Sequence, residues 1–220
     1  MLIVTGGFID RKWAESYIKD LKYEGVIVAD AGVHAARELG LYADVIIGDF
    51  DSAKKEELAV YEEILFKAGK KYEKIVLPAN KDMSDTEAAL DYALKSHADH
   101  ITILGANGTR FDHALANVHT LVHALRAGAF ACLADANNRI RLADKNSRVV
   151  IKKEEQYGKY ISLFPLTTDV RGVNAEGFLY PLHDAMLYGG CSLGVSNELK
   201  EEEGVITLKE GILIIIESKD

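Results

Sequence analysis

Four polar clusters follow short apolar runs in this sequence, and their residue types suit metal and phosphate chemistry. Asp30 follows the run Val26–Ala29, and Asp49 and Asp51 follow the run Val45–Ile47. Oxygen ligands with open positions suit Mg²⁺, and two carboxylates one residue apart on a short loop can point in the same direction. Asp49 and Asp51 are therefore candidate ligands of a divalent metal ion.

The other two clusters combine acids with basic residues and glycines. Lys81, Asp82 and Asp85 come shortly after Ile75–Leu77. The last cluster follows Ile101–Leu104 and comprises Gly105, Gly108, Arg110, Asp112 and His113. Glycines let backbone N–H groups and the positive end of a following helix approach a phosphate, and an arginine adds a planar, bidentate contact. The loop is neither a Walker A loop nor a dinucleotide fingerprint, because it lacks their residues and spacing.

Helix capping is an alternative role for several of these residues. The pair Asp51-Ser52 can cap the next helix, and Ser84 with Glu87 fits a capping box. Asp112 can cap its helix in the same way. Capping explains any one cluster as well as catalysis does, but it explains less well why two aspartates flank a phenylalanine directly after a strand. His113 has no Ser or Cys nucleophile in an elbow motif beside it, so we interpret it as a structural or phosphate-contacting residue.

The apolar runs are continuous rather than alternating, which indicates strands of a parallel sheet buried on both faces. They are Leu2–Val4, Val26–Ala29, Val45–Ile47, Ile75–Leu77, Ile101–Leu104 and Phe130–Leu133. Helical patterns lie between them, at Trp13–Leu21, Val33–Leu39, Lys54–Lys67, Thr86–Ser96 and His113–Ala127. This rhythm predicts a Rossmann-like α/β domain over residues 1–137, with right-handed crossovers. Ligands of such sheets bind outside the carboxyl ends of the strands, so the four clusters should converge on one edge.

The rhythm changes after residue 137, where short β-like runs are broken by Gly, Asn and Pro. The clearest strands are Tyr160–Phe164, Gly204–Leu208 and Ile212–Glu217, and no helix of ordinary length is apparent. The turn Lys209-Glu210-Gly211 joins the last two and contains a glycine that can adopt a positive φ. We therefore predict an all-β sandwich domain over residues 138–220.

The composition argues against several classes of protein. Of the 220 residues, 48% are hydrophobic and 27% are charged, which is typical of a globular fold with a sizeable core. A net charge of −8 without a basic stripe argues against a nucleic-acid partner. Two cysteines are too few for a disulfide framework or a zinc cluster. With no signal peptide and no apolar run near the roughly 20 residues of a membrane helix, we expect a cytoplasmic protein without a membrane partner.

Taken together, the clusters resemble those of the thiamine pyrophosphokinase family. The matching segments are Ala29–Gly32, Gly48–Ser52, Lys81–Asp85 and Leu104–His113, then Gly177–Leu182 and Gly194–Asn197. Their order runs over nearly the whole chain, and Gly-Asp-Phe-Asp-Ser followed by Lys-Asp-x-x-Asp is the most specific part. Three positions depart from the family's pattern: Ser84 stands for Thr, Thr109 for Gly, and Tyr180 where relatives can have Trp.

The resemblance implies an enzyme that transfers pyrophosphate from ATP to the hydroxyl of thiamine, giving thiamine pyrophosphate and AMP. Asp49, Asp51 and Asp85 would hold Mg²⁺ and would be catalytic together with Asp82. The ATP-binding residues would be Asp30, Gly32, Lys81, Gly105, Gly108, Arg110, Asp112 and His113. In the second domain, Tyr180 would offer an aromatic face to thiamine, and Ser196 and Asn197 would offer hydrogen bonds. The resemblance also implies a homodimer with its sites between subunits.

Several alternatives stay open at this point. The acceptor of the hydroxyl proton is Asp85, Asp82 or solvent. The acceptor substrate is thiamine or another hydroxymethyl heterocycle such as a pterin, since the same metal and phosphate groups would serve both. A non-catalytic nucleotide or thiamine sensor of the same fold is a third possibility, although such a protein needs no set of carboxylates.

Overall fold

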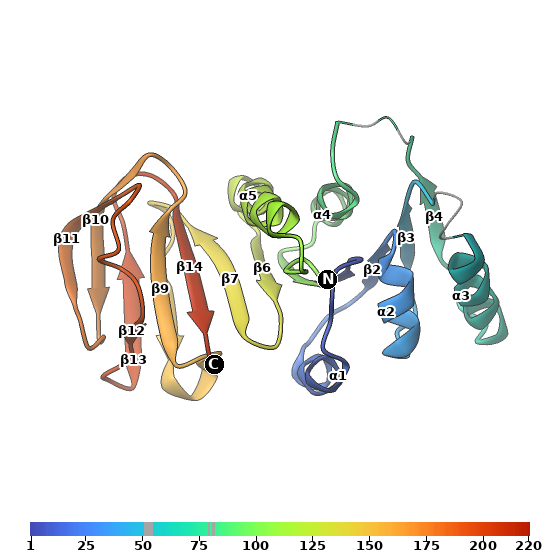
Figure 1. Ribbon diagram of the computed structural model, residues 1–220, viewed down its shortest axis with the longest axis horizontal. Helices are drawn as coiled ribbons and strands as arrows, with labels where there is room; N and C mark the ends of the chain where they lie inside the picture. The colour runs from blue at the N-terminus through green and yellow to red at the C-terminus, as the bar shows by residue number, and fades with distance from the viewer. Residues whose placement is uncertain (51–54, 79, 81) are drawn as a thin grey trace. The chain divides into compact units, whose positions relative to one another are not determined.

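The chain folds into two compact units, Met1–Ala136 and Asn137–Asp220. The computed structural model describes residues 1–50, 55–78, 80 and 82–220 (Figure 1). The candidate residues Asp51 and Lys81, and the possible cap Ser52, lie outside the described residues.

The first unit alternates strands with helices, which confirms the predicted α/β rhythm. Its elements are β1 (Leu2–Val4), α1 (Arg11–Asp20), β2 (Val26–Ala29), α2 (Gly32–Glu38), β3 (Val45–Gly48), α3 (Lys55–Lys67), β4 (Glu73–Val76), α4 (Asp85–Lys95), β5 (His100–Leu104), α5 (Phe111–Ala127) and β6 (Phe130–Ala134). The strands lie in the order β6-β5-β1-β2-β3-β4, and their pairing is parallel throughout.

This strand order contains a switch point between β1 and β5. From β1 the chain adds β2, β3 and β4 on one side, and it then returns to place β5 on the other side of β1. The connection from β1 therefore leads toward β2 on one side, and the connection from β5 leads toward β6 on the other side. In open α/β sheets the crevice at such a point, outside the carboxyl ends of the strands, is where ligands bind.

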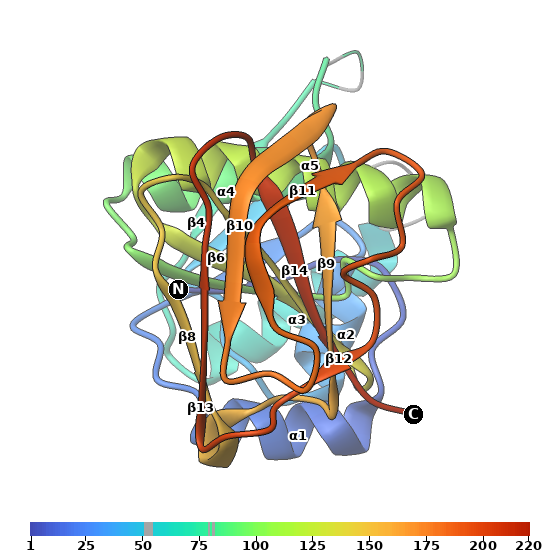
Figure 2. The same cartoon turned by 90° about the vertical axis from the view of Figure 1, so that its left-hand side faces the viewer.

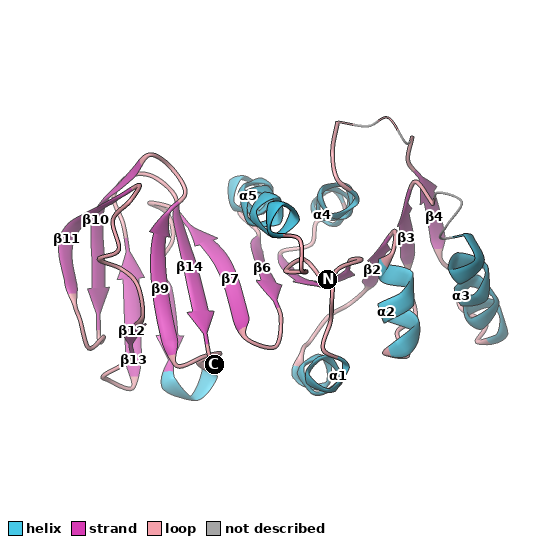
Figure 3. Cartoon of the chain, in the orientation of Figure 1, coloured by secondary structure: helices cyan, strands magenta, loops and turns pink. Residues whose placement is uncertain are grey.

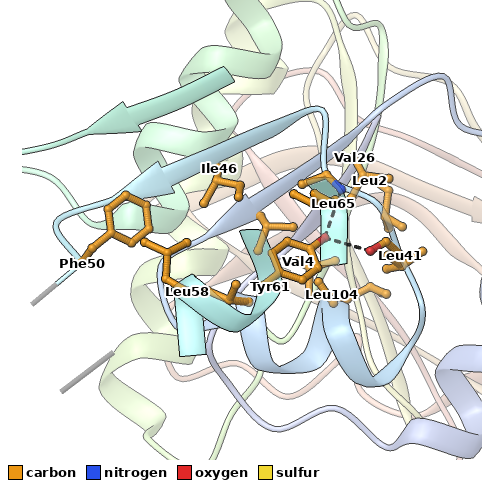
Figure 4. Close-up of a cluster of buried hydrophobic side chains, with 14 of the residues drawn as sticks. Leu2, Val4, Val26, Leu41, Ile46, Phe50, Leu58, Tyr61, Leu65 and Leu104 are labelled. Atoms are coloured by element: carbon orange, nitrogen blue, oxygen red, sulfur yellow. Dashed lines mark hydrogen bonds between the residues drawn. The ribbon is translucent and has the colours of Figure 1, made fainter. Parts of the chain in front are cut away.

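Helices cover both faces of the sheet of the first unit. Figure 1 shows α4 and α5 on one face and α1 and α2 on the other. The α1–α3 side contains a hydrophobic core with Tyr61 of α3 at its centre (Figure 4). The buried Tyr61 hydroxyl donates to the carbonyl of Leu41 at 2.8 Å and accepts from the N–H of Ala43 at 3.0 Å. Burial raises the pKa of Tyr61 to about 12.

One strand of the first unit differs from its prediction. The run Ile75–Leu77 was expected to be buried on both faces, but β4 is the last strand in the sheet order and its Val76 is 66% exposed. An edge strand has a sheet neighbour on one side only, and here its faces are also incompletely covered.

The second unit consists of short strands, with a single helical turn (Figure 3). Its elements are β7 (Asn138–Ala143), β8 (Val149–Lys152), η1 (Lys153–Glu155), β9 (Tyr160–Pro165), β10 (Asp169–Glu176), β11 (Leu182–Tyr188), β12 (Asn197–Glu198), β13 (Glu203–Thr207) and β14 (Leu213–Ser218). The strands form two antiparallel layers, in the orders β12-β9-β14-β7 and β11-β10-β13-β8 (Figure 2). Buried residues of both layers share one hydrophobic core.

The turn before the last strand connects these two layers. β13 pairs with β8 and β10, whereas β14 pairs with β7 and β9. Gly211 has a φ of 90°, which supports the predicted use of a glycine with positive φ. The turn therefore takes the chain from one layer to the other rather than closing a hairpin.

Among the helices in the described residues, none is long and apolar enough to cross a membrane.

Candidate functional site

A cavity of about 560 Å³ lies at the switch point of the first unit. Its lining comes from the loops after four of the strands and from the starts of α4 and α5. The lining residues are Thr5, Gly6, Gly7, Phe8, Ala29, Asp30, Ala31, Asp49, Met83, Ser84, Asp85, Thr86, Gly105, Ala106, Gly108, Thr109, Arg110, His113 and Asn117. The predicted convergence of polar clusters on one edge of the sheet is therefore present among the described residues.

Glycines let the loops after β1 and β5 touch backbone to backbone. The N–H of Gly7 donates to the carbonyl of Gly105 at 3.0 Å, and a Cβ atom on Gly7 would lie 2.1 Å from that oxygen. Gly105 has a φ of 77°, and a Cβ atom there would lie 2.5 Å from the carbonyl oxygen of Thr5. Only glycine fits such an approach, so these residues fix the shape of this side of the cavity.

We expect Gly105→Ala to destabilise the first unit more than Gly128→Ala. Gly128, after α5, has a similar φ of 74°, but a Cβ atom there would have no neighbouring atom within 4 Å, so its substitution adds backbone strain alone. Gly105→Ala adds a clash with Thr5 to the same strain and should lose clearly more than about 1 kcal/mol of unfolding free energy. Urea unfolding followed by the fluorescence of Trp13 measures both variants. Equal losses would show that the contact with Thr5 relaxes without cost.

Two strained residues carry or flank the acids of the cavity. Asp30 is buried and has a φ of 44°, and Phe50 is buried and has a φ of 47°. Positive φ is unusual for any residue with a Cβ atom and is an outlier for a bulky one, and such strain is common at functional sites. The ring of Phe50 packs in the core of the α1–α3 side, next to Leu58 in Figure 4. This anchor fixes the backbone immediately after Asp49, whose half-buried side chain lines the cavity.

The start of α4 brings a third acid to the same cavity. Ser84 is the N-cap of α4, and its Oγ accepts from the N–H of Glu87 at 3.1 Å. That half of the predicted capping box is confirmed. Asp85 is the first residue of the helix and lines the cavity together with Ser84. Capping and cavity formation are thus compatible roles of one segment.

The start of α5 is built differently. Its N-cap is Arg110, whose side chain makes no capping hydrogen bond, and Asp112 lies inside the helix. The alternative in which Asp112 caps this helix is therefore excluded. Its carboxylate instead accepts from Nη2 of Arg110 at 2.7 Å, and this hydrogen bond holds the pKa of Asp112 below its usual value and raises that of Arg110. Both side chains are exposed, so the pair can open.

The loop before α5 offers a run of backbone donors. In the part of the chain that the structure describes, no N–H group of residues 106–110 donates a hydrogen bond. The first turn of α5 adds the N–H groups that any helix leaves unpaired at its start. Arg110 and His113 flank these donors and line the cavity. Such a concentration of donors at a helix start suits an anion.

Some candidate residues do not line the cavity. Asp82 is exposed and is absent from its lining, as is Asp112. Gly32 is buried at the start of α2, where a Cβ atom would lie 2.3 Å from the carbonyl oxygen of Val4. The structure thus gives Gly32 a packing role against β1. The metal and catalytic roles of Asp51 and the nucleotide role of Lys81 concern residues outside those described.

The carboxylates of the described residues do not form a complete metal site. No group of three or more His, Cys, Asp or Glu side chains in the described ranges is placed to hold a metal ion. Asp49 and Asp85 nevertheless line one cavity, and Mg²⁺ in phosphate-transfer sites uses one or two carboxylates together with substrate oxygens and water.

In the second unit, the two segments predicted to bind thiamine lie side by side. The buried amide of Asn197 accepts from the N–H of Tyr180 at 3.0 Å and donates to the carbonyl of Tyr180 at 2.7 Å. Tyr180 is 64% exposed. Ser196 is exposed with a φ of 56°, and its N–H donates to Oγ of Ser162 at 3.0 Å. Asn197 therefore holds the backbone from which Tyr180 presents its ring.

Sequence reasoning missed one wall of the cavity and one helix residue. The wall is the segment from Thr5 to Phe8 after β1, and the helix residue is Asn117 of α5. The signal for the first was available, because Gly6-Gly7 follows an apolar strand in the same way as the other clusters do. Asn117 had no comparable signal, since its position depends on how α5 packs.

Comparisons with known proteins agree with this architecture. The family description "Thiamin pyrophosphokinase, catalytic domain" matches residues 16–133, and "Thiamin pyrophosphokinase, vitamin B1 binding domain" matches residues 146–213. A thiamine pyrophosphokinase of Bacillus subtilis is 33% identical over 194 residues, which cover 88% of this chain and 87% of that protein.

Solved structures give the same result. The crystal structure of thiamine pyrophosphokinase from Bacillus subtilis has a TM-score of 0.84 at 31% identity and covers 100% of this chain and 98% of that one. The thiamin pyrophosphokinase from Geobacillus thermodenitrificans has a TM-score of 0.82 at 27% identity, covering 100% and 97%. On the two matching domains and the extent of the sequence match, the chain belongs to the thiamine pyrophosphokinase family.

Proposed function

We propose that this protein transfers the pyrophosphoryl group of ATP to the hydroxyl of thiamine, releasing AMP. The observation that carries the proposal is the cavity at the switch point, which is lined both by a donor-rich loop and by the acids Asp30, Asp49 and Asp85. Binding a polyphosphate needs such donors, and placing acids beside it needs a cation between them. The first unit, with its parallel sheet and switch point, would act as a Rossmann-like nucleotide-binding domain, and the second unit would bind thiamine.

Mg²⁺ is the cation that fits this donor set. Asp49 and Asp85, joined by Asp51, would hold it together with phosphate oxygens of ATP. When bound, Mg²⁺ withdraws charge from the phosphates and so favours attack on phosphorus. The residues of the chain orient the polyphosphate, through the loop N–H groups and Arg110, and keep the carboxylates close to it. Asp85 lines the cavity and Asp82 does not, so of these two acids we propose Asp85 as the acceptor of the hydroxyl proton.

Arg110 should contact the phosphates by leaving its partner Asp112. We expect Arg110→Ala to raise the KM for ATP by about tenfold or more, because a charge-assisted, bidentate contact is lost. Arg110→Lys keeps the charge without the planar fork and should recover part of the loss. Thermal stability should change little, since the pair with Asp112 is exposed. A lower melting temperature with unchanged ATP kinetics would make Arg110 a structural residue.

Tyr180 should provide the aromatic face for the cationic thiazolium ring of thiamine. We expect Tyr180→Ala to raise the KM for thiamine about three- to tenfold and to leave the KM for ATP unchanged. Tyr180→Phe removes only the hydroxyl and should behave like the wild type. Asn197→Ala should produce the same selective loss, because it removes both hydrogen bonds that hold the Tyr180 backbone. Equal changes in the two KM values would argue against a thiamine-specific role.

We also propose a homodimer in which both subunits contribute to each site. Its test uses mixed dimers of an Asp49→Asn subunit and a Ser196→Ala subunit, provided that each variant alone is inactive. Recovered activity supports a shared site. Absent recovery with demonstrated mixing places each site within one chain.

An assay of AMP release with a panel of acceptors tests the proposed function. The protein, MgATP and either thiamine, a hydroxymethylpterin or no acceptor are incubated, and AMP is measured with a coupled enzyme. The proposal requires AMP release that depends on thiamine. Release with the pterin alone would change the acceptor, and ATP binding without any release would indicate a sensor.

A further inference from the structure

Asn117 is a polar residue on the buried face of α5. It is 8% exposed and shares that face with Val118, Leu121 and Ala124. Its Nδ2 donates to the carbonyl of Ala106 at 2.8 Å. The amide orientation follows from chemistry, because a carbonyl oxygen can only accept. The hydrogen bond therefore ties the loop before α5 to the middle of the same helix.

The neighbouring peptide of this loop is tied as well. The carbonyl of Gly105 accepts from the N–H of Gly7 at 3.0 Å, so two consecutive carbonyls are held by other parts of the first unit. In a trans peptide the C=O and the N–H point in opposite directions. Fixing these carbonyls therefore fixes the directions of the N–H groups of Ala106 and Asn107, neither of which donates a hydrogen bond among the described residues.

A third tether acts one residue further on. Nδ2 of Asn107 donates to Oδ2 of Asp135, directly after β6, at 2.7 Å. The loop is thus held from the β1 side, from α5 and from the end of β6. Of these three tethers, Asn117 is the one that comes from the helix whose start carries Arg110 and His113. The Asn117 hydrogen bond therefore fixes the position of the loop N–H groups relative to the side chains of Arg110 and His113.

We propose that Asn117 is a positioning residue for the polyphosphate of ATP, acting through the backbone of residues 105–107. This inference rests on the proposed function. Asn117 orients the Ala106–Asn107 peptide, and that orientation makes the loop N–H groups available to phosphate oxygens. In Asn117→Asp, the ionised carboxylate has no proton to donate to the Ala106 carbonyl, so the hydrogen bond is lost. The protonated carboxylic acid has an O–H donor and can restore it.

Asn117→Asp and Asn117→Ala, compared with the wild type, test this role. Binding of the magnesium complex of α,β-methylene-ATP, which cannot be cleaved between those phosphorus atoms, is measured by calorimetry between about pH 5 and pH 8. At the upper end both variants should bind about tenfold or more weakly than the wild type. As the pH falls, Asn117→Asp should regain affinity relative to the wild type, because burial raises the pKa of its carboxyl group. Asn117→Ala should show no such recovery, and the KM for thiamine should stay unchanged in both.

The outcomes separate this inference from the function on which it rests. Parallel pH profiles of the two variants, or equal weakening of ATP and thiamine, overturn the positioning role while leaving the function intact. A wild type that does not bind the ATP analogue overturns the proposed function and the inference with it. If Asn117→Asp fails to fold, Asn117→Gln takes its place: its amide keeps the donor on a longer, flexible stem, so its affinity should exceed that of Asn117→Ala, and equal affinity overturns the role.

Discussion

Asp49→Asn should lower kcat by about 10²–10³ while the protein keeps its fold. The substitution preserves size and removes the charge that would hold Mg²⁺ against the polyphosphate. Asp49 lines the cavity at the carboxyl end of β3, and its backbone is anchored by the buried ring of Phe50. Asp85→Asn, at the start of α4, should have a comparable effect because it lines the same cavity. Initial rates of AMP release at saturating ATP and thiamine measure both variants.

Asp99→Asn is the matched control for this prediction. Asp99 lies just before β5, at the amino ends of the strands, whereas the cavity lies at their carboxyl ends. The side chain of Asp99 is 91% exposed. Its loss should leave kcat unchanged. Near-normal turnover of Asp49→Asn and Asp85→Asn would remove the metal assignment. Asp85 would then be an acid that only stabilises the positive end of α4.

Glu217→Ala should remove about 3–5 kcal/mol of the unfolding free energy of the second unit. Glu217 of β14 is fully buried, and its carboxylate accepts two hydrogen bonds from Arg139, of 3.0 and 2.8 Å. Arg141 lies 3.3 Å away, and the N–H of Tyr157 donates to the same carboxylate at 3.1 Å. Removing the acid takes this carboxylate away from two largely buried guanidinium groups.

The measurement must report on the second unit. The single tryptophan, Trp13, lies in the first unit, so its fluorescence is no direct probe of the strands around Glu217. Hydrogen exchange of the amides of β7 and β14 does, because those strands pair with each other. Asp184→Asn is the control: its pair with Lys209 also lies in the second unit, is exposed at both ends and should contribute little to stability. Equal losses in the two variants would show that the buried network is no stronger than a surface ion pair.

The first unit was largely predictable from the sequence because parallel strands covered by helices are continuous apolar runs. β4 shows the limit, because its apolar run gives no sign that it lies at an edge. The second unit was harder. β7 reads Asn-Arg-Ile-Arg-Leu-Ala and β11 reads Leu-His-Asp-Ala-Met-Leu-Tyr. In such half-buried strands polar residues interrupt the apolar pattern, and the arginines of β7 meet their carboxylate, Glu217, on a strand far along the chain, β14.

The candidate site shows the same division. Strand ends are readable from sequence, so the clusters containing Asp30, Asp49 and Asp85 were found. Asp112 does not cap α5 because the helix begins two residues earlier than expected, at Phe111 rather than His113. Contacts between segments are not readable from the sequence, which is why the hydrogen bonds of Asn197 and Asn117 were not foreseen. Both asparagines act on backbone groups of distant residues. The sequence shows an amide at those positions but not which carbonyl or N–H group it meets.

The most direct test of the proposed function follows the phosphorus atoms during one reaction. Protein, Mg²⁺, ATP and thiamine are mixed, and ³¹P NMR records the products. Pyrophosphoryl transfer predicts that AMP and a thiamine ester with two coupled phosphorus signals appear in equal amounts, and that neither appears without thiamine. Formation of ADP with a thiamine ester carrying one phosphorus, or AMP formation independent of thiamine, would contradict it.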